Sequence, residues 1–290
     1  MTDSVPSEIV QQVEEQTGSF VRHFSFASGG CINHGGCIST SSGDFFIKWN
    51  DLKEFPKMFV SEARGLTLLQ EANALTVPKV VYAGEAGSYQ FLLLEYLPEG
   101  KKSPEFWKNF GSGLARLHMK SADVFGLDHD NYIGSLAQRN TQSFSWVEFF
   151  IEHRLKIQLR MARDKKILDD GTTKKFDTLF NRLPSLLPEE QPSLLHGDLW
   201  GGNLMVSADG QASIIDPAVY FGHREMDIAM TKLFGGFDYS YLESYQEVFP
   251  LQPGFEDRLG IYNLYPLLVH VNLFGKGYIS QILAVLRMLV

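Results

Sequence analysis

Residues 196–203 read His-Gly-Asp-Leu-Trp-Gly-Gly-Asn, and the apolar pair Ile214-Ile215 further along the chain runs directly into Asp216. The spacing of Asp198, Asn203 and Asp216 is typical of phosphoryl-transfer centres. In such centres one carboxylate accepts the proton of the acceptor hydroxyl or orients that hydroxyl, and the other two side chains hold magnesium. We therefore assign Asp198 as the catalytic base, and Asn203 and Asp216 as magnesium ligands. Considered alone, Asp216 would be interpreted as the cap of a turn. Its spacing from Asp198 and Asn203 favours the interpretation as a metal ligand.

The composition is that of a globular protein. The 290 residues are 44% hydrophobic and 21% charged, enough for one large domain or two lobes. The net charge of −8 opposes a general nucleic-acid or anionic-membrane surface, because such surfaces need clustered cations. The chain begins without the basic and apolar regions of a signal peptide, and it has no uncharged apolar run of about eighteen residues. We expect a cytoplasmic protein that binds neither nucleic acid nor membrane.

Alternating apolar and polar residues in the first third of the chain predict a sheet. The turn Pro98-Glu99-Gly100 then resembles a hinge, so we expect a first lobe over 1–97 and a second lobe over 98–290. The elements expected in the first lobe are a helix over 7–17, strands over 20–27, 37–40 and 44–49, a helix over 57–72, and strands over 78–83 and 89–96.

Helix signals dominate the second lobe, with one return to strand periodicity. A turn at 208–210 predicts a hairpin between strands over 204–206 and 213–215. The expected fold class is therefore α+β, with five strands and a helix in the first lobe. The helix signals are a cap at Ser103 with Pro104 at the first helical position, a capping box at Ser145 for a helix that runs to about 163, a stop at Pro184, and apolar helices from 225 onward.

Lys48 lies inside the predicted strand over 44–49, and Glu62 lies on the predicted helix that follows. Glu62 could pair with Lys48 and hold its ammonium group against the nucleotide phosphates. The alternative is an edge-strand lysine with its head in water and an ordinary surface glutamate.

Residues 28–36 form a glycine-rich stretch that offers backbone amides and little side-chain bulk, as a loop over phosphates requires. Gly29, Gly30, Cys31 and Asn33 are its candidate nucleotide contacts. It lacks the Gly-Lys-Ser/Thr of a P-loop, and a flexible hairpin loop is the alternative. The two cysteines have neither the spacing of a zinc site nor the density of a disulfide-rich secreted protein. Cys31 could be a redox-sensitive thiol or an inert reduced one.

Further candidates lie on either side of Asp216. Trp200 could face a sugar or a cationic amine, or it could pack between the lobes. His223 and Arg224 could touch substrate or phosphate, or they could be an exposed basic pair. We expect His196 to hydrogen-bond within the catalytic loop, and Asp227 to brace that loop, with no chemical role for either.

These residues resemble the fructosamine kinase (ketosamine-3-kinase) family over nearly the whole chain. Asp216-Pro217 replaces the Asp-Phe-Gly of eukaryotic protein kinases, and the aminoglycoside and choline kinases share only the broader pattern. The segments that carry the resemblance are residues 196–203, residues 214–227, Gly29-Gly30-Cys31-Ile32-Asn33 and Asn131-Tyr132-Ile133-Gly134.

The resemblance implies a two-lobed protein-kinase-like fold that uses ATP and Mg²⁺ to phosphorylate the 3-hydroxyl of a small or protein-bound ketosamine. It also implies that Lys48 and Glu62 clamp the nucleotide and that Glu95, Tyr96 and Leu97 meet adenine. We expect a monomer or weak homodimer. The alternative functions are an aminoglycoside or choline-type phosphotransferase, and a nucleotide-binding regulator without turnover.

Overall fold

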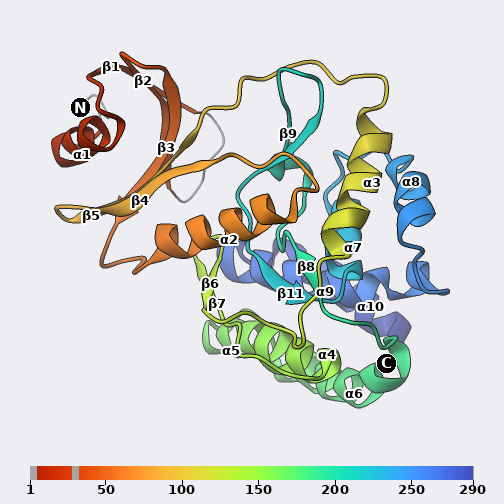
Figure 1. Ribbon diagram of the computed structural model, residues 1–290. Helices are drawn as coiled ribbons and strands as arrows, with labels where there is room; N and C mark the ends of the chain where they lie inside the picture. Colours follow the sequence, from red (N-terminus) through yellow and green to blue (C-terminus); the bar gives the residue numbers. More distant parts are fainter. Residues whose placement is uncertain (1–4, 28–32, 290) are drawn as a thin grey trace.

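The computed structural model describes residues 5–27 and 33–289. Its N-terminal part is a five-stranded antiparallel sheet with two helices, and its C-terminal part is mainly helical (Figure 1). This confirms the expected α+β class. The lobe boundary at residue 97 stays a prediction.

The strands of the sheet are arranged in the order β1-β2-β3-β5-β4. The first three form the predicted meander, and β5 then inserts beside β3 so that β4 lies at the edge. The elements are α1 (Ser7–Thr17), β1 (Val21–Phe26), β2 (His34–Thr40), β3 (Asp44–Asp51), α2 (Met58–Ala72), β4 (Val80–Ala86) and β5 (Tyr89–Glu95).

Each face of the sheet is covered by one helix, so β5 is apolar on both sides. Leu92 and Leu94 share a core with α2, whereas Phe91 and Leu93 share a separate core with Ile9 of α1. Side chains that alternate along a strand point to opposite faces, which explains the unbroken apolar run of this strand. The sequence assigned only one helix to the sheet; α1 covers the second face.

The pairing of β3 with β5 decides where Lys48 points. Lys48 lies opposite Leu92 in the antiparallel register, and residues opposite each other share a face of the sheet. Lys48 therefore projects towards α2, the helix that carries Glu62.

The C-terminal part packs its helices around short two-stranded sheets (Figure 1). Its elements are α3 (Phe106–His118), β6 (Asn131–Ile133), β7 (Leu136–Gln138), α4 (Trp146–Phe149), the π-helix η1 (Phe150–Leu155), α5 (Lys156–Asp164), α6 (Asp170–Leu186), β8 (Ser193–Leu195), the 3₁₀ turn η2 (Gly201–Asn203), β9 (Leu204–Val206), β10 (Ala212–Ile214), β11 (Tyr220–Gly222), α7 (Glu225–Leu233), α8 (Tyr241–Val248), α9 (Phe255–Phe274), the 3₁₀ turn η3 (Lys276–Tyr278) and α10 (Ile279–Leu289).

Helix α2, orange in Figure 1, joins the two parts through one shared core. Its Leu66 belongs to the same cluster as Leu114 of α3 and Ile228 of α7. At Gly65 a β-carbon would lie 3.1 Å from Val219, so the glycine lets the helix approach the segment that follows Asp216.

Two predicted helix ends were wrong. Ser103 does not cap α3: its carbonyl accepts the N–H of Phe106 (3.1 Å) in a turn, and the helix begins after that turn. Pro184 does not stop α6, which continues to Leu186. A proline removes only one backbone donor, and the N–H of Leu187 still bonds the carbonyl of Leu183 (3.0 Å).

The predicted capping box at Ser145 is only half formed: the hydroxyl of Ser145 accepts the N–H of Glu148 (3.3 Å), but the N–H of Ser145 donates to Ser143 and not to the side chain of Glu148. The helix it opens is not continuous, however. The π-helix Phe150–Leu155 separates α4 from α5.

Among the helices of the described ranges, none combines the length and apolar composition needed to cross a membrane.

Candidate active site

The loop that carries Asp198 is held in place by a buried carboxylate. Asp227 accepts hydrogen bonds from the backbone N–H groups of His196 (2.7 Å) and Gly197 (2.9 Å). Gly197 has a φ of 83°, and a β-carbon there would lie 2.1 Å from the carbonyl oxygen of Ala218, so only glycine fits. The bracing role expected for Asp227 is confirmed.

His196 joins the two halves of the site by hydrogen bonds. Its ring is fully buried, and its Nδ1 accepts the backbone N–H of Asp198 (3.2 Å). The other ring nitrogen therefore carries the proton and donates to the carbonyl of Ile215 (2.9 Å). Burial lowers the pKa of His196. As expected, the ring has a structural role: it links the Asp198 loop to the residue before Asp216 by hydrogen bonds.

The structure brings Asp198, Asn203 and Asp216 together. The amide nitrogen of Asn203 donates to the carbonyl oxygen (2.9 Å) and to Oδ2 (3.1 Å) of Asp198, and lies 3.4 Å from the carbonyl oxygen of Asp216. Asp216 has a φ of 53°, in the left-handed region that non-glycine residues seldom adopt, although asparagine and aspartate do so more often than the others. Backbone strain of this kind concentrates at functional positions.

Lys48 is buried against two carboxylates. Its Nζ lies 2.7 Å from Oε1 of Glu62 and 2.5 Å from Oδ1 of Asp216. The alternative of a lysine head in water is therefore wrong, because the side chain is only 8% exposed. Burial alone would lower the pKa of Lys48, but the carboxylates of Asp216 and Glu62 outweigh it and hold the pKa above its ordinary value. The ammonium stays charged where phosphates would lie.

Asp198 has a strongly raised pKa. Burial raises its pKa to about 7; the hydrogen bond from Asn203 opposes the shift, and the charges of Asp216 and Asp227 add to it. A carboxylate with a raised pKa is a better proton acceptor near neutral pH than an ordinary aspartate.

The residues around Asp216 fit a magnesium ion. Mg²⁺ binds oxygen ligands and usually shares them with substrate phosphates. The carboxylate of Asp216 is about half exposed, and one of its two oxygens is occupied by Lys48. The amide oxygen of Asn203, beside it, makes no hydrogen bond within the described residues. Two hard oxygen donors are thus available side by side.

The predicted nucleotide contacts are only partly described. Gly29, Gly30 and Cys31 lie outside the described residues, and Asn33 accepts a hydrogen bond from the side chain of Asn50 (2.8 Å). Downstream, Glu95 ends β5. Over the described ranges, the N–H groups of Tyr96 and Leu97 have no hydrogen-bond partner. Free backbone donors at this position are compatible with the predicted adenine contact.

Trp200 stands at the surface of the catalytic loop. Its side chain is 40% exposed, and its ring lies edge-on to Phe234 with centroids 6.4 Å apart. A β-carbon at Gly202 would lie 2.3 Å from the indole, which explains why glycine follows the tryptophan so closely. Trp200 is therefore accessible next to Asp198, but its contact with substrate stays a prediction.

The structure contradicts the substrate role of His223 and Arg224. Both are almost completely buried, and Arg224 makes a two-pronged ion pair with Glu190 (2.8 Å for each bond). Its guanidinium also stacks 3.7 Å above the ring of Phe249. The alternative of an exposed basic pair is equally wrong, because Glu190 supplies a buried counter-charge far away in the sequence.

His223 should make the stability of the protein depend on pH. Burial lowers the pKa of His223 to about 4, although the negative charge of Glu190 opposes this shift. The unfolded chain, with an ordinary histidine pKa of about 6.5, therefore binds the proton first as the pH falls. We expect the free energy of unfolding to decrease by roughly 3 kcal/mol between about pH 6.5 and pH 4 from this group alone.

Urea unfolding at a series of pH values measures this effect. The variant His223→Gln removes the titrating ring and should flatten the stability profile between about pH 6.5 and pH 4. Loss of stability below that range, where Glu190 with its lowered pKa is protonated, should remain. An unchanged slope in the variant would contradict the assignment to His223.

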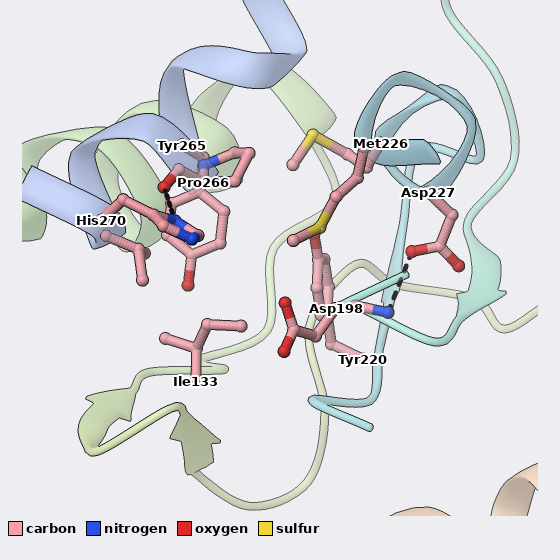
Figure 2. A pocket seen from close by; sticks show the side chains of 11 residues that line it. Ile133, Asp198, Tyr220, Met226, Asp227, Tyr265, Pro266 and His270 are labelled. Atoms are coloured by element: carbon pink, nitrogen blue, oxygen red, sulfur yellow. Dashed lines mark hydrogen bonds between the residues drawn. The ribbon is translucent and has the colours of Figure 1, made fainter. Parts of the chain in front are cut away.

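A cavity lies directly against Asp198, and apart from Asp198 none of the side chains that line it was predicted as a site residue. Figure 2 shows the carboxylate of Asp198 pointing into the space between Ile133 and Tyr265. Apart from Tyr220 of β11, the remaining side chains come from α7 and α9, two apolar helices without any local motif. The lining includes Ile133, Tyr220, Met226, Met230, Tyr265, Pro266, Val269 and His270.

The cavity is small, about 10 Å³, roughly the space of one water molecule. A sugar could enter only if the lining side chains move. Met226 and Met230 on one wall are flexible enough to do so. Ile133 belongs to the segment Asn131-Tyr132-Ile133-Gly134, which carries part of the family resemblance. The sequence alone did not assign that segment to the site.

Comparisons with known proteins show which family the chain resembles. Residues 5–290 match the fructosamine kinase family. A candidate ketoamine kinase of Synechocystis is 37% identical over 94% of this chain and 92% of its own length. The chloroplastic protein-ribulosamine 3-kinase of Arabidopsis thaliana is 39% identical over 89% of this chain and 79% of its own length.

Solved structures point the same way. The crystal structure of a candidate fructosamine-3-kinase from Thermobifida fusca superimposes with a TM-score of 0.89 at 34% identity, covering 98% of both chains. An aminoglycoside phosphotransferase aligns with a TM-score of 0.63 over 97% of this chain and 98% of its own. At 15% identity, this second likeness shows a shared kinase-like fold only.

Proposed function

The chain belongs to the fructosamine kinase family, and from this premise we propose that it transfers the γ-phosphoryl group of ATP to the 3-hydroxyl of a ketosamine. The observation that carries the proposal is the grouping of Lys48, Glu62, Asp198, Asn203 and Asp216 around one point. A phosphate at that carbon makes the sugar adduct prone to eliminate, which releases the free amine.

Each residue has a separate task in this reaction. Asp198 orients the acceptor hydroxyl and takes its proton, because its half-buried carboxylate has a raised pKa. Lys48, held by Glu62, places a positive charge against the phosphates. Asn203 and Asp216 would hold Mg²⁺, which neutralises charge that develops on the phosphoryl oxygens when it is bound. Positioning and charge are most of what this chemistry requires from the protein.

The substrate would lie between the cavity beside Asp198 and the exposed face of Trp200. The cavity wall offers the ring of Tyr265 and the half-buried ring of His270. Trp200 stands at the loop edge and could cover the sugar or the ammonium group of the ketosamine. This placement accounts for a tryptophan between Asp198, which serves the acceptor hydroxyl, and Asn203, which would hold the metal.

A panel of ketosamines tests the proposal. We expect Mg²⁺-dependent ADP release with a fructosamine, ribulosamine or erythrulosamine of the same amine, and mass spectrometry should find one added phosphate. The variant Asp198→Asn sets the background. ADP release at that background with all three compounds would contradict the proposal. Turnover of an aminoglycoside or of choline instead would favour the alternative kinase activity.

The cellular setting remains a prediction from the sequence. A monomer or weak homodimer in the cytoplasm is expected, whereas the Arabidopsis relative is named as chloroplastic. Light scattering at several protein concentrations would settle the oligomeric state.

A further inference from the structure

A π-helix interrupts the helix that was expected to run from residue 145 to about 163. Over Phe150–Leu155 the chain winds more widely, and the N–H of Lys156 bonds the carbonyl of Ile151, five residues back. One extra residue in a turn shifts every later side chain around the helix axis. π-Helices are rare in proteins, and those that do occur are frequently found at functional sites. The side chain that this turn carries inward is Arg154.

Arg154 is a fully buried cation without a carboxylate partner among the described residues. The other two deeply buried arginines are neutralised, Arg224 by Glu190 and Arg258 by Glu225. Arg154 donates instead to the carbonyl of Arg139 (2.5 Å) and to Oδ1 of Asn140 (2.7 Å). A buried charge that lacks a counter-charge is costly. Its retention therefore needs a reason other than stability.

The hydrogen bonds of Arg154 continue to the segment that follows Asp216. Asn140, which Arg154 contacts, donates to Oδ1 of Asn131 (2.9 Å). Asn131 in turn donates to the carbonyl of Val219 (2.8 Å). A parallel branch runs through Gln138, which donates to Asn131 (2.9 Å) and to the carbonyl of Ala218 (3.0 Å). All of these amide side chains are buried.

The same guanidinium lies behind two walls of the cavity at Asp198. It stacks 4.0 Å above the ring of Tyr220 and 5.4 Å from that of Tyr265. Figure 2 shows Tyr220 beside Asp198 and Tyr265 across the cavity. The hydroxyl of Tyr265 donates to Oε1 of Gln138 (2.7 Å), so this ring belongs to the network as well. The guanidinium of Arg154 thus touches both cavity walls directly, and it reaches the segment after Asp216 through Asn140 and Asn131.

We propose that Arg154, delivered by the π-helix, is a positioning residue that fixes the walls of the substrate cavity relative to Asp216. The flat guanidinium fork can bond Asn140 through its edge while its face stacks on Tyr220, whereas an ammonium group has no flat face to stack. The role assigned to the cavity rests on the proposed ketosamine kinase activity.

The variant Arg154→Lys tests this role, because it keeps the charge and loses the fork. We expect kcat for a ribulosamine to fall by roughly 10²-fold, since a misplacement of about 1 Å in a reacting group has that effect. The KM for the ketosamine should rise, whereas the KM for ATP should stay within twofold of wild type, because Lys48 and Glu62 lie outside the network. Arg154→Gln should behave in the same way.

The matched control is Arg258→Lys, at another buried arginine that stabilises the fold through an ion pair. It should lower the melting temperature and leave kcat and both KM values near wild type. Equal kinetic losses in Arg258→Lys and Arg154→Lys would overturn the proposal, because they would reflect general destabilisation. Wild-type kinetics in a folded Arg154→Lys would overturn it too.

A second readout does not depend on the substrate. Methyl NMR of ¹³C-labelled methionine reports on Met226 and Met230, which line the cavity. We expect both signals to shift or broaden in Arg154→Lys, whereas in Arg258→Lys the Met230 signal should stay in place; Met226 is not diagnostic in that control, because it directly follows Glu225, the partner of Arg258. If the wild type turned over no ketosamine, the proposed function would fail, and these signals would still decide whether Arg154 orders the cavity. Unchanged signals in Arg154→Lys would overturn its positioning role.

Discussion

The variant Asp198→Asn is expected to lose between roughly 10²-fold and 10⁴-fold in kcat, which is the usual contribution of a positioned general base. Asparagine has nearly the same shape and can still accept the hydrogen bond that Asn203 donates to the side chain (3.1 Å). It cannot take a proton from the acceptor hydroxyl. Steady-state kinetics with a saturating ketosamine would measure the loss.

Binding of the nucleotide should survive this change. Lys48, Glu62 and Asp216 keep their contacts, so the affinity for Mg-ATP measured by calorimetry should stay within a fewfold of wild type. Removal of a neighbouring negative charge could even strengthen it. The surface variant Asp123→Asn is the matched control and should match the wild type in every measurement. A kcat within tenfold of wild type for Asp198→Asn would exclude Asp198 as the base.

The phosphoryl-transfer residues could be predicted because local pattern and register determine them. A strand periodicity of two placed Lys48 in β3, and pairing with β5 then turned it towards α2 and Glu62. The carboxylate of Asp198 and the amide of Asn203 lie within one tight loop, so their distance follows from their spacing. Such contacts depend on neighbours in the sequence or on one strand pairing.

The errors concern residues whose surroundings come from distant segments. The sequence suggested that His223 and Arg224 contact substrate or phosphate. Glu190, some thirty positions earlier, instead pairs with Arg224 in the interior and neutralises it. One wall of the cavity comes from α9, a helix that is apolar nearly all around and therefore shows no single inward face. No periodicity distinguishes Tyr265 or His270 from its neighbours.

The π-helix marks a different limit. A search for apolar residues at helical spacing assumes 3.6 residues in every turn, and the segment after Ser145 satisfies that pattern well enough to predict a continuous helix. The inserted residue becomes visible only when the tertiary partners are known, because Phe149 and Arg154 are both buried on the same side. Arg154 therefore could not be recognised in the sequence as an interior residue.

The variant Asp216→Asn is expected to lower kcat by roughly 10³-fold, because a metal ion contributes several kcal/mol of charge stabilisation and each 1.36 kcal/mol is tenfold in rate. An amide is a weaker and neutral ligand for a hard cation. The affinity for ATP should also lose its dependence on Mg²⁺. Calorimetric titration of ATP with and without Mg²⁺ would measure that loss directly.

The fold should tolerate this substitution, which makes the loss interpretable. Asp216 has a φ of 53°, and asparagine is the residue other than glycine that adopts this region most readily. Lys48 keeps its contact with Glu62 (2.7 Å), so the buried ammonium retains a counter-charge. The melting temperature should therefore stay close to that of the wild type. A folded Asp216→Asn protein whose ATP affinity still responded to Mg²⁺ would show that the metal is held elsewhere, whereas an unfolded one would assign Asp216 to stability, because Lys48 would then need both carboxylates.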